Sequence, residues 1–289
     1  MSPEAAKRSR YAPIPEPLLE VARSARVQVS RLSAGSRLEP SYLIIGTQKG
    51  GTSSLQSYLG EHPSVSIPRL KEVNYFNRNY ERRYSWYRAQ FPRRPASGAD
   101  EPVTGEATPE YLFDPRVPKR VAERLPHVKL MVLLRNPATR ALSHYHHEVA
   151  RGNESLSFRE ALEAEPGRTR SDAERIRRDP DFKSDALRHY TYAARGMYAE
   201  QLERWFERFS RDRVLVLQSE KFFAQPDAVY QRVLEALNLT PYSPQTFRVY
   251  NSRAYAALSD DDRRFLEEKF VEPNERLFEL LGERYDWEA

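Results

Sequence analysis

Short, continuous runs of apolar residues are spread along this chain and alternate with stretches of helical spacing. The apolar runs are 42–45, 128–134 and 214–217. Runs of this length, rich in Val, Ile and Leu, are typical of strands buried on both faces of a parallel sheet. Apolar positions recur every three or four residues, as on one helix face, in 115–125, 198–209 and 228–237. The alternation predicts an α/β fold in which helices flank a central parallel sheet.

One large domain is expected to span residues 41–289, because the apolar strands are distributed over that whole range. The 39% hydrophobic content is sufficient for one sizeable core. Residues 1–40 mix Arg, Ser, Pro and Ala and are predicted to form a partly flexible N-terminal arm. Residues 259–281 are expected to form a terminal helix that packs on the domain and is kinked or broken by Pro273.

Residues 151–185 are charged and poor in apolar positions. The pairs Pro166-Gly167 and Asp179-Pro180 are expected to break the chain direction there. We therefore expect a lid or flexible excursion that carries a short helix at 158–164. Residues 64–67 alternate apolar and polar positions like a short strand.

The first apolar run breaks into glycines and hydroxyls, and helical spacing resumes at Leu55. The connecting residues are Gly46-Thr47-Gln48-Lys49-Gly50-Gly51-Thr52-Ser53. A loop that wraps an anion must turn its N–H groups inward, and glycine permits the positive φ and close backbone approach this requires. A helix beginning near Thr52 would direct its first N–H groups at the same anion. The sequence therefore predicts a P-loop-like strand, phosphate loop and helix.

This loop departs from the usual nucleotide-binding pattern G-x-x-x-x-G-K-[ST]. Gly46 and Gly51 fit that pattern, but Thr52 stands at the lysine position and the lysine is Lys49. We find no apolar strand that ends in an acidic residue able to help hold Mg²⁺; the run 128–134 leads into Arg135 instead. The combination favours a phosphate-rich ligand that is handled without a metal.

Charge and cysteine content narrow the class of protein. With 46 Lys and Arg against 41 Asp and Glu, the formal charge of +5 does not resemble the concentrated basic surface of a nucleic-acid binder. Cysteine is absent, so a disulfide framework and a thiol metal site are excluded, and a cytoplasmic location is the default expectation. No apolar run approaches the roughly 18 residues of a membrane span.

Three motifs resemble those of one enzyme family. They are Lys49-Gly50-Gly51-Thr52, Lys71-Glu72-Val73-Asn74-Tyr75-Phe76-Asn77 and Leu134-Arg135-Asn136-Pro137-Ala138-Thr139-Arg140-Ala141-Leu142-Ser143-His144-Tyr145. In this order they look like the sulfotransferases that use 3′-phosphoadenosine 5′-phosphosulfate, above all the heparan-sulfate type and its bacterial relatives. The resemblance runs from about Tyr42 to Trp287.

The resemblance implies how the chain would hold this donor. Lys49 would lie on the bridging oxygen of the leaving nucleotide. The rest of the loop would hold the 5′-phosphate, through Gln48, Gly50, Gly51, Thr52 and Ser53. Arg135 and Ser143 would hold the 3′-phosphate, with Arg253 as a weaker candidate for a second contact there. Arginine suits this role because its planar fork donates two N–H groups to phosphate oxygens.

The resemblance also implies that Glu72 is the general base that takes the proton of an attacking hydroxyl or amine. A solvated ion pair between Lys71 and Glu72 is the alternative explanation of the same residues. The run 105–111 is similar to a family element with a lysine near the active site, but Ala107 stands at that lysine position. One cation that could contact the sulfuryl group or the acceptor is therefore missing.

Other clusters have two possible explanations. Residues 77–92 interleave aromatic and basic side chains. They could floor a cleft for an acidic or sugar-like acceptor, but we favour an amphipathic helix whose Trp86 and Phe91 lie in the core and whose arginines are solvated. His144 and His147 are spaced to share a metal, but the pattern His-Glu-x-x-His is absent and no metal is expected. His189 could be a second proton acceptor or a structural histidine.

Two other functions compete with sulfuryl transfer. A metal-dependent small-molecule kinase would need Mg²⁺ and an acidic ligand for it. A non-catalytic nucleotide-binding module would bind adenosine 3′,5′-bisphosphate, the product nucleotide, without turnover. The presence of both Lys49 and Glu72 favours the enzyme, with a saccharide or another small molecule as acceptor.

Overall fold

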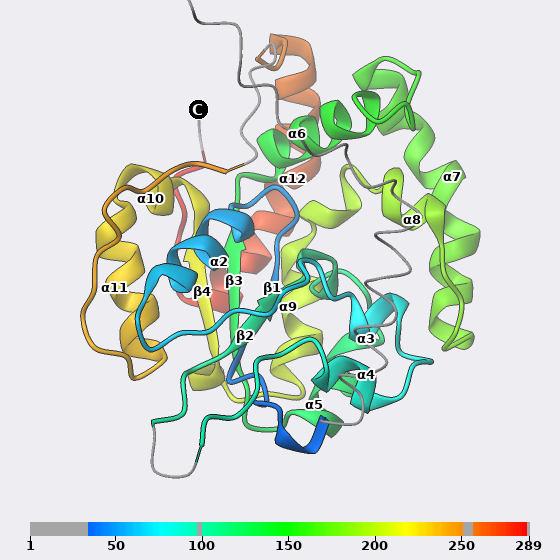
Figure 1. Ribbon diagram of the computed structural model, residues 1–289. Coiled ribbons are helices and arrows are strands. Elements are labelled where there is room, and N and C mark those ends of the chain that lie inside the picture. The colour runs from blue at the N-terminus through cyan, green and yellow to red at the C-terminus, as the bar shows by residue number, and fades with distance from the viewer. Residues whose placement is uncertain (1–33, 97–99, 251–256, 288–289) are drawn as a thin grey trace, which may run out of the picture.

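A parallel sheet of four strands, in the order β2-β1-β3-β4, forms the centre of the computed structural model (Figure 1). The model describes residues 34–96, 100–250 and 257–287, so that most of the expected arm and Arg253 lie outside the described residues. The strands are β1 Tyr42–Gly46, β2 Gly105–Ala107, β3 Lys129–Leu134 and β4 Val214–Gln218. The predicted α/β fold with a parallel sheet flanked by helices is confirmed.

The three strands expected from apolar runs are present, and β3 is an inner strand as its strongly apolar sequence predicts. Strand β2 was missed because only three residues, Gly105–Ala107, pair with β1. The expected strand at 64–67 is wrong: only Val65 forms a single bridge, to Val103. So short a segment has too few ladder hydrogen bonds to form a strand.

Helices surround the sheet. Their bounds are α2 Thr52–Glu61, α3 Tyr75–Arg78, α4 Tyr84–Arg88, α5 Val117–Arg124, α6 Pro137–Val149, α7 Phe158–Arg178, α8 Asp185–His189, α9 Tyr198–Phe206, α10 Ser219–Ala224, α11 Pro226–Ala236 and α12 Asp260–Leu281. Single 3₁₀ turns are η1 Ala34–Ser36, η2 Pro109–Tyr111, η3 Ala194–Gly196 and η4 Arg211–Arg213.

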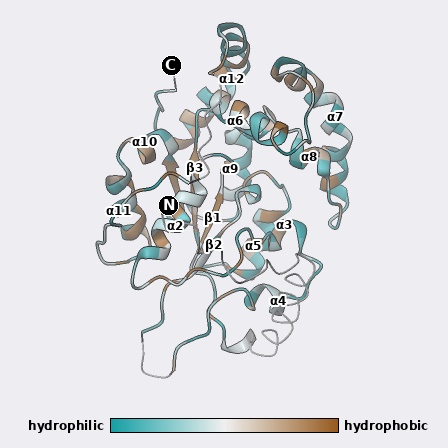
Figure 2. Ribbon diagram, turned by 45° about the horizontal axis from the view of Figure 1, so that its top comes forward, coloured by the Kyte–Doolittle hydropathy of each residue, from teal (hydrophilic) through white to brown (hydrophobic). Residues whose placement is uncertain are grey.

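Each face of the sheet buries its own core. On one face, Ile44 of β1 and Leu133 of β3 belong to a cluster with residues of α2, α10 and α11. On the other, Leu43 and Val132 belong to a cluster with residues of α5, α9 and α12. Alternate residues of each strand thus point to opposite cores, as the two-residue period of a strand requires. Figure 2 shows the hydrophobic colouring concentrated in the strands and more hydrophilic residues on the outer helices.

The chain differs from the sequence prediction where proline was expected to end helices. Helix α7 runs to Arg178, well beyond the expected short helix, and passes through Pro166. Pro166 and the following glycine lie on the exposed face, where water can hydrogen-bond the carbonyl that proline leaves unpaired. Helix α12 likewise continues through Pro273. The chain does break at Asp179-Pro180, where α7 ends as expected.

Residues 77–92 also differ from expectation. In place of one amphipathic helix they form the end of α3 and the short helix α4.

Among the described residues, no helix is both long and apolar enough to cross a bilayer.

Candidate active site

A cavity of about 1010 Å³ lies at the carboxyl ends of the strands. Segments that follow all four strands contribute to its lining, which is where parallel α/β sheets bind ligands. The lining includes most of the residues predicted from the sequence: Gln48, Lys49, Gly51, Thr52, Ser53, Glu72, Arg135 and Ser143. The structure therefore brings together residues up to about ninety positions apart in the chain.

The loop after β1 is tightly constrained. The Gly50 N–H donates to the carbonyl of Thr47 at 2.9 Å, and the Thr47 N–H donates to that of Leu133 at 2.9 Å. A Cβ atom on Gly50 would lie 2.6 Å from the Leu133 carbonyl oxygen, so only glycine fits there. Gly51 has a φ of +101°, which disfavours other residues. The loop leads directly into α2, whose first two residues, Thr52 and Ser53, line the cavity.

Arg135 connects the loop to the third strand. Its Nη1 donates to the Lys49 carbonyl at 3.2 Å, and its Nε donates to Thr139 Oγ1 at 3.1 Å. Ser143 lies one turn further along α6 and lines the same cavity. Gln48 Oε1 is buried without a hydrogen-bond partner among the described residues. The cavity therefore offers a glycine-rich loop, a guanidinium, a hydroxyl and an amide oxygen without a partner among the described residues.

Glu72 lies in the same cavity, half-buried. Burial raises the pKa of its carboxyl and nearby Glu110 raises it further, while Lys71 and Arg188 oppose the shift. Lys71 reaches the first turn of α2, since its Nζ donates to Ser53 Oγ at 2.6 Å. A carboxylate with a raised pKa beside a ligand cavity is suited to accept a proton.

Glu106 is a buried carboxyl on the middle residue of the edge strand β2, where it pairs with Leu43 of β1, and its role was not foreseen from the sequence. It is 1% exposed. Tyr111 donates its hydroxyl to Oε1 at 2.9 Å, and Thr108 donates to Oε2 at 2.6 Å. Burial raises the pKa of Glu106 to about 7, although these hydroxyl donors oppose the shift. A carboxyl this deep must be held by hydrogen bonds.

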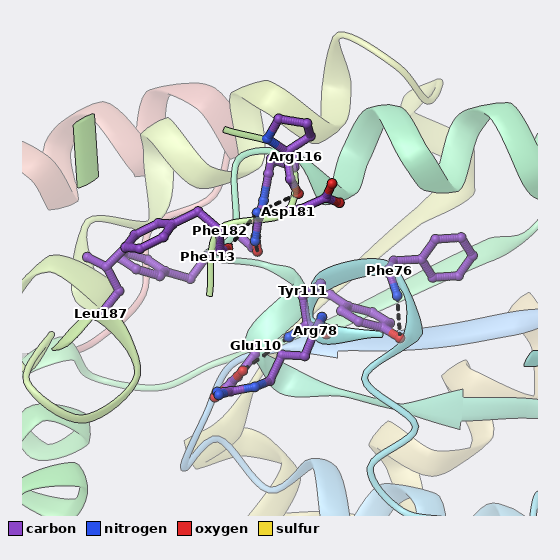
Figure 3. A network of polar contacts seen from close by, with 12 residues as sticks. Phe76, Arg78, Glu110, Tyr111, Phe113, Arg116, Asp181, Phe182 and Leu187 are labelled. Atoms are coloured by element: carbon purple, nitrogen blue, oxygen red, sulfur yellow. Dashed lines mark hydrogen bonds and ion pairs between the residues drawn. The ribbon is translucent and has the colours of Figure 1, made fainter. Parts of the chain in front are cut away.

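The same two hydroxyls hold the segment that follows the candidate base. Tyr111 Oη accepts the N–H groups of Tyr75 at 2.9 Å and Phe76 at 3.3 Å (Figure 3). Thr108 Oγ1 accepts the N–H of Asn74 at 3.3 Å. Three consecutive N–H groups thus depend on hydroxyls that Glu106 orients. The sequence does contain a signal for this network, because Glu106 is followed closely by Thr108 and Tyr111. The sequence analysis described this run only through its resemblance to a family element.

Comparison with known proteins agrees with this geometry. The family model described as "Sulfotransferase domain" matches residues 39–261. The chain belongs to the sulfotransferase family. It is also similar to a solved structure, the sulfotransferase from Alicyclobacillus acidocaldarius, with a TM-score of 0.69 and 28% identity over 87% of this chain and 100% of that one.

Two curated relatives are longer than this chain. Heparan sulfate glucosamine 3-O-sulfotransferase 6 of Mus musculus is 30% identical over 79% of this chain and 62% of its own length. Membrane-associated sulfotransferase kil1 of Dictyostelium discoideum is 26% identical over 86% of this chain and 66% of its own length. The chain thus spans about two thirds of these relatives or less.

The cavity at the strand ends contains an acidic residue, Glu220, that the sequence analysis did not assign to the site. Glu220, two residues after β4, lines the cavity. Its Oε1 accepts the N–H of Asn136 at 2.9 Å, and its Oε2 accepts Nε1 of Trp287 at 3.2 Å. Asn136 Nδ2 in turn donates to the Trp287 carbonyl at 2.7 Å. Glu220 therefore links the C-terminal segment to the start of α6.

The histidines of α6 divide between the cavity and the core. His147 lines the cavity, whereas His144 is fully buried with Nε2 3.5 Å from Glu148 Oε1. Glu148 stands four residues after His144, a helical pairing that the sequence analysis overlooked. Burial lowers the pKa of His144 to about 3.

His189 is held in place by the same carboxylate, Glu148. The Nδ1 of His189 lies 2.7 Å from Glu148 Oε2 and 3.2 Å from Asn153 Nδ2. Burial raises the pKa of Glu148, but the close approach of His144 at 3.5 Å and the hydrogen bonds of Asn153 and His189 lower it to about 2. His189 does not line the cavity described above, which favours its structural explanation.

Within the described residues, no three His, Cys, Asp or Glu side chains are grouped to hold a metal ion.

Proposed function

We propose that this protein transfers a sulfuryl group from 3′-phosphoadenosine 5′-phosphosulfate to a hydroxyl or amine of a saccharide or other small-molecule acceptor. The observation that carries the proposal is the meeting of Lys49, Arg135 and Glu72 in one cavity at the strand ends. Family membership and the similarity to a heparan sulfate glucosamine sulfotransferase support it.

The residues of the cavity fit a doubly phosphorylated nucleotide. The loop backbone with Thr52 and Ser53 would hold the 5′-phosphate, and Arg135 with Ser143 would hold the 3′-phosphate. The glycine-only position at Gly50 supports this, because the loop there approaches β3 too closely for any side chain. The bound donor would supply a sulfuryl group on a good leaving group, the nucleotide phosphate.

Lys49 would neutralise the negative charge that accumulates on the leaving oxygen as the bond to sulfur breaks. Glu72 would take the proton from the acceptor hydroxyl or amine, leaving that atom free to attack sulfur. The raised pKa of Glu72 makes it a stronger base than an ordinary exposed glutamate. The Glu106 network would fix the backbone that carries this base.

The kinase alternative is weakened by the position of Glu220. A kinase would need an acidic metal ligand at the end of a strand, and Glu220 stands at such a position. One of its carboxylate oxygens, however, accepts a hydrogen bond from Asn136, and the other accepts one from Trp287. A metal would have to compete with those donors.

A cytoplasmic location, predicted from the sequence, stays a prediction.

Transfer of labelled sulfate from the donor across a panel of saccharides and small metabolites tests the proposal. In parallel, thermal-shift titrations should compare adenosine 3′,5′-bisphosphate with ATP and Mg²⁺. We expect stabilisation by the bisphosphate and transfer to at least one acceptor. Stabilisation by ATP and Mg²⁺ with no response to the bisphosphate would support the kinase instead. Bisphosphate binding without any transfer would support a non-catalytic module.

A further inference from the structure

The peptide unit that joins Arg135 to Asn136 is held by a side chain at each of its two polar atoms. The Tyr198 hydroxyl donates to the Arg135 carbonyl at 2.8 Å. The Asn136 N–H donates to Glu220 Oε1 at 2.9 Å. Rotation of this peptide plane would break at least one of the two hydrogen bonds. The direction in which the backbone presents the Arg135 side chain is therefore fixed.

The C-terminal segment 283–287, which follows α12, orients Glu220 in turn. Trp287 donates Nε1 to Glu220 Oε2 at 3.2 Å, so the two carboxylate oxygens accept from different segments of the chain. The Trp287 carbonyl accepts Nδ2 of Asn136 at 2.7 Å. Trp287 is 8% exposed, and its ring packs on that of Phe278 with centroids 5.8 Å apart. The segment is thus anchored in the core and contacts both partners of the hydrogen bond between Asn136 and Glu220.

Asn136 also restrains the first turn of α6. Its Oδ1 accepts the N–H groups of Ala138 at 2.9 Å and Thr139 at 3.2 Å, so Asn136 is the N-cap of the helix. Thr139 Oγ1 accepts Nε of Arg135 at 3.1 Å, and the Lys49 carbonyl accepts Nη1 at 3.2 Å. The guanidinium therefore leaves a fixed backbone and contacts a fixed helix turn.

Glu220 carries a negative charge in a cavity suited to an anion. Its carboxylate lines the same cavity as Arg135 and would repel a phosphate group. A carboxylate, however, accepts two N–H donors at once, which a neutral amide cannot do in its place, because the amide nitrogen is itself a donor. The charge is favourable for ligand binding only if these two hydrogen bonds matter more than the repulsion.

We propose that Glu220 is a positioning residue that, together with Tyr198 and Trp287, orients the Arg135 guanidinium toward the 3′-phosphate of the donor nucleotide. This inference rests on the proposed function, because it takes Arg135 as the residue that binds that phosphate. A guanidinium binds phosphate best through two parallel N–H donors, so a small rotation of the backbone at Arg135 weakens the contact.

Two nucleotides that differ only in the 3′-phosphate separate the orientation of Arg135 from general stability. Equilibrium dialysis gives the affinities for adenosine 3′,5′-bisphosphate and adenosine 5′-phosphate, and their ratio measures what the 3′-phosphate contributes. The variants are Glu220→Gln and Tyr198→Phe, one at each end of the peptide unit. The control for charge is Asp286→Asn, which removes a negative charge from the same cavity. The control for the hydroxyl is Tyr145→Phe, since Tyr145 of α6 donates to the Leu156 carbonyl.

We expect the ratio to fall about tenfold in Glu220→Gln and about threefold in Tyr198→Phe, the typical losses for a charge-assisted and a neutral hydrogen bond. A carboxylate that only faces the cavity predicts the opposite sign for Glu220→Gln, because its removal favours the more highly charged nucleotide. Asp286→Asn should leave the ratio unchanged or raise it, and Tyr145→Phe should leave it unchanged. Trp287→Phe keeps a ring in the core, removes the donor to Glu220 without a change of charge, and should lower the ratio as well.

An unchanged or raised ratio in Glu220→Gln would overturn the positioning role, and so would a parent that binds both nucleotides equally. Equal losses for both nucleotides leave the ratio unchanged, which is the result that a purely structural role predicts. Sulfate transfer is measured separately on the same preparations. A ratio that falls in both variants, without transfer by the parent, would leave the positioning role standing and overturn the proposed function. Transfer by a parent whose ratio is insensitive to Glu220 and Tyr198 would do the reverse.

Discussion

Tyr111 donates its hydroxyl to the buried carboxyl of Glu106 at 2.9 Å, and the same oxygen accepts two backbone N–H groups from the segment behind Glu72. One hydroxyl thus joins the sheet edge to the backbone that carries the candidate base. Because the contact is buried, its removal leaves three polar groups without their partner. The consequence is measurable both in stability and in rate.

Tyr111→Phe should lower the free energy of unfolding by about 1–3 kcal/mol, the usual cost of unsatisfied buried polar groups. The rate constant of transfer should fall while the affinity for adenosine 3′,5′-bisphosphate stays unchanged, because the phosphate loop is untouched. Urea denaturation and steady-state kinetics measure the two effects. Tyr145→Phe is the control, since it removes a hydroxyl that donates to the Leu156 carbonyl. Equal rates in Tyr111→Phe and the parent would contradict the positioning role.

Lys49→Ala should reduce transfer by about 10²–10³-fold, the typical loss for one preorganised donor at a developing charge. Nucleotide binding should remain measurable, because the loop N–H groups and Arg135 persist. Labelled-sulfate transfer and a thermal-shift titration give the two quantities. Lys129→Ala is a suitable control, because Lys129 lies at the amino end of β3, away from the cavity at the carboxyl ends of the strands. Its Nζ donates to the Asp212 carbonyl. Activity within tenfold of the parent would show that Lys49 has another role.

Gly50→Ala should weaken adenosine 3′,5′-bisphosphate binding. The added Cβ would meet the Leu133 carbonyl oxygen at 2.6 Å and Thr47 Cγ2 at 2.9 Å, so the loop must shift. Gly167→Ala is the matched control, since nothing lies within 4 Å of its Cβ position and it is in a helix. That control should stabilise the protein by up to about 1 kcal/mol. Unchanged nucleotide affinity in Gly50→Ala would argue against the loop as the phosphate site.

The acid side of the pH–rate profile should move in opposite directions in two variants. Transfer declines as Glu72 is protonated, at a pH above that of an ordinary glutamate because its pKa is raised. Glu110 raises the pKa of Glu72, so Glu110→Gln should move this decline to lower pH. Arg188 lowers that pKa, so Arg188→Gln should move the decline to higher pH. Profiles of kcat at saturating donor measure both shifts, and a shift of both in one direction would exclude Glu72 as the titrating base.

Stability should also depend on pH through Glu106. Its pKa is about 7 in the fold and 4.5 in an unfolded chain, so the folded state binds the proton more tightly. Its contribution is complete below pH 4.5 and is lost as the pH rises to about 7, up to roughly 3 kcal/mol. Glu106→Gln cannot titrate, so the difference in unfolding free energy between parent and variant should change over this range. A constant difference would contradict the raised pKa.

The strand, loop and helix around Lys49 could be predicted because their signals are local. Apolar runs define β1, β3 and β4, and glycines placed the loop between β1 and α2. The order of the motifs was enough to expect Lys49, Arg135 and Ser143 at one sheet edge, since parallel strands present their carboxyl ends together.

Helix α7 and strand β2 show where local signals fail. The proline in α7 was expected to end the helix, but the capping box of Ser157 and Glu160 and buried residues such as Leu162 outweigh one lost hydrogen bond. Strand β2 has three residues and no apolar pattern of its own. It exists because β1 offers a partner, which is a property of the folded chain.

The sequence by itself determined the fold class, through apolar runs and helical spacing along the chain. Its local motifs were also enough to propose the loop after β1 and Glu72 as parts of the site, because each motif consists of residues close together in the chain. Only the tertiary structure decided the surroundings of that base. The hydrogen bonds of Thr108 and Tyr111 to residues 74–76 and the link between Glu220 and Trp287 join residues far apart in sequence. The raised pKa of Glu106 and the partners of Glu220 arise from burial and proximity, which no pattern along the chain contains.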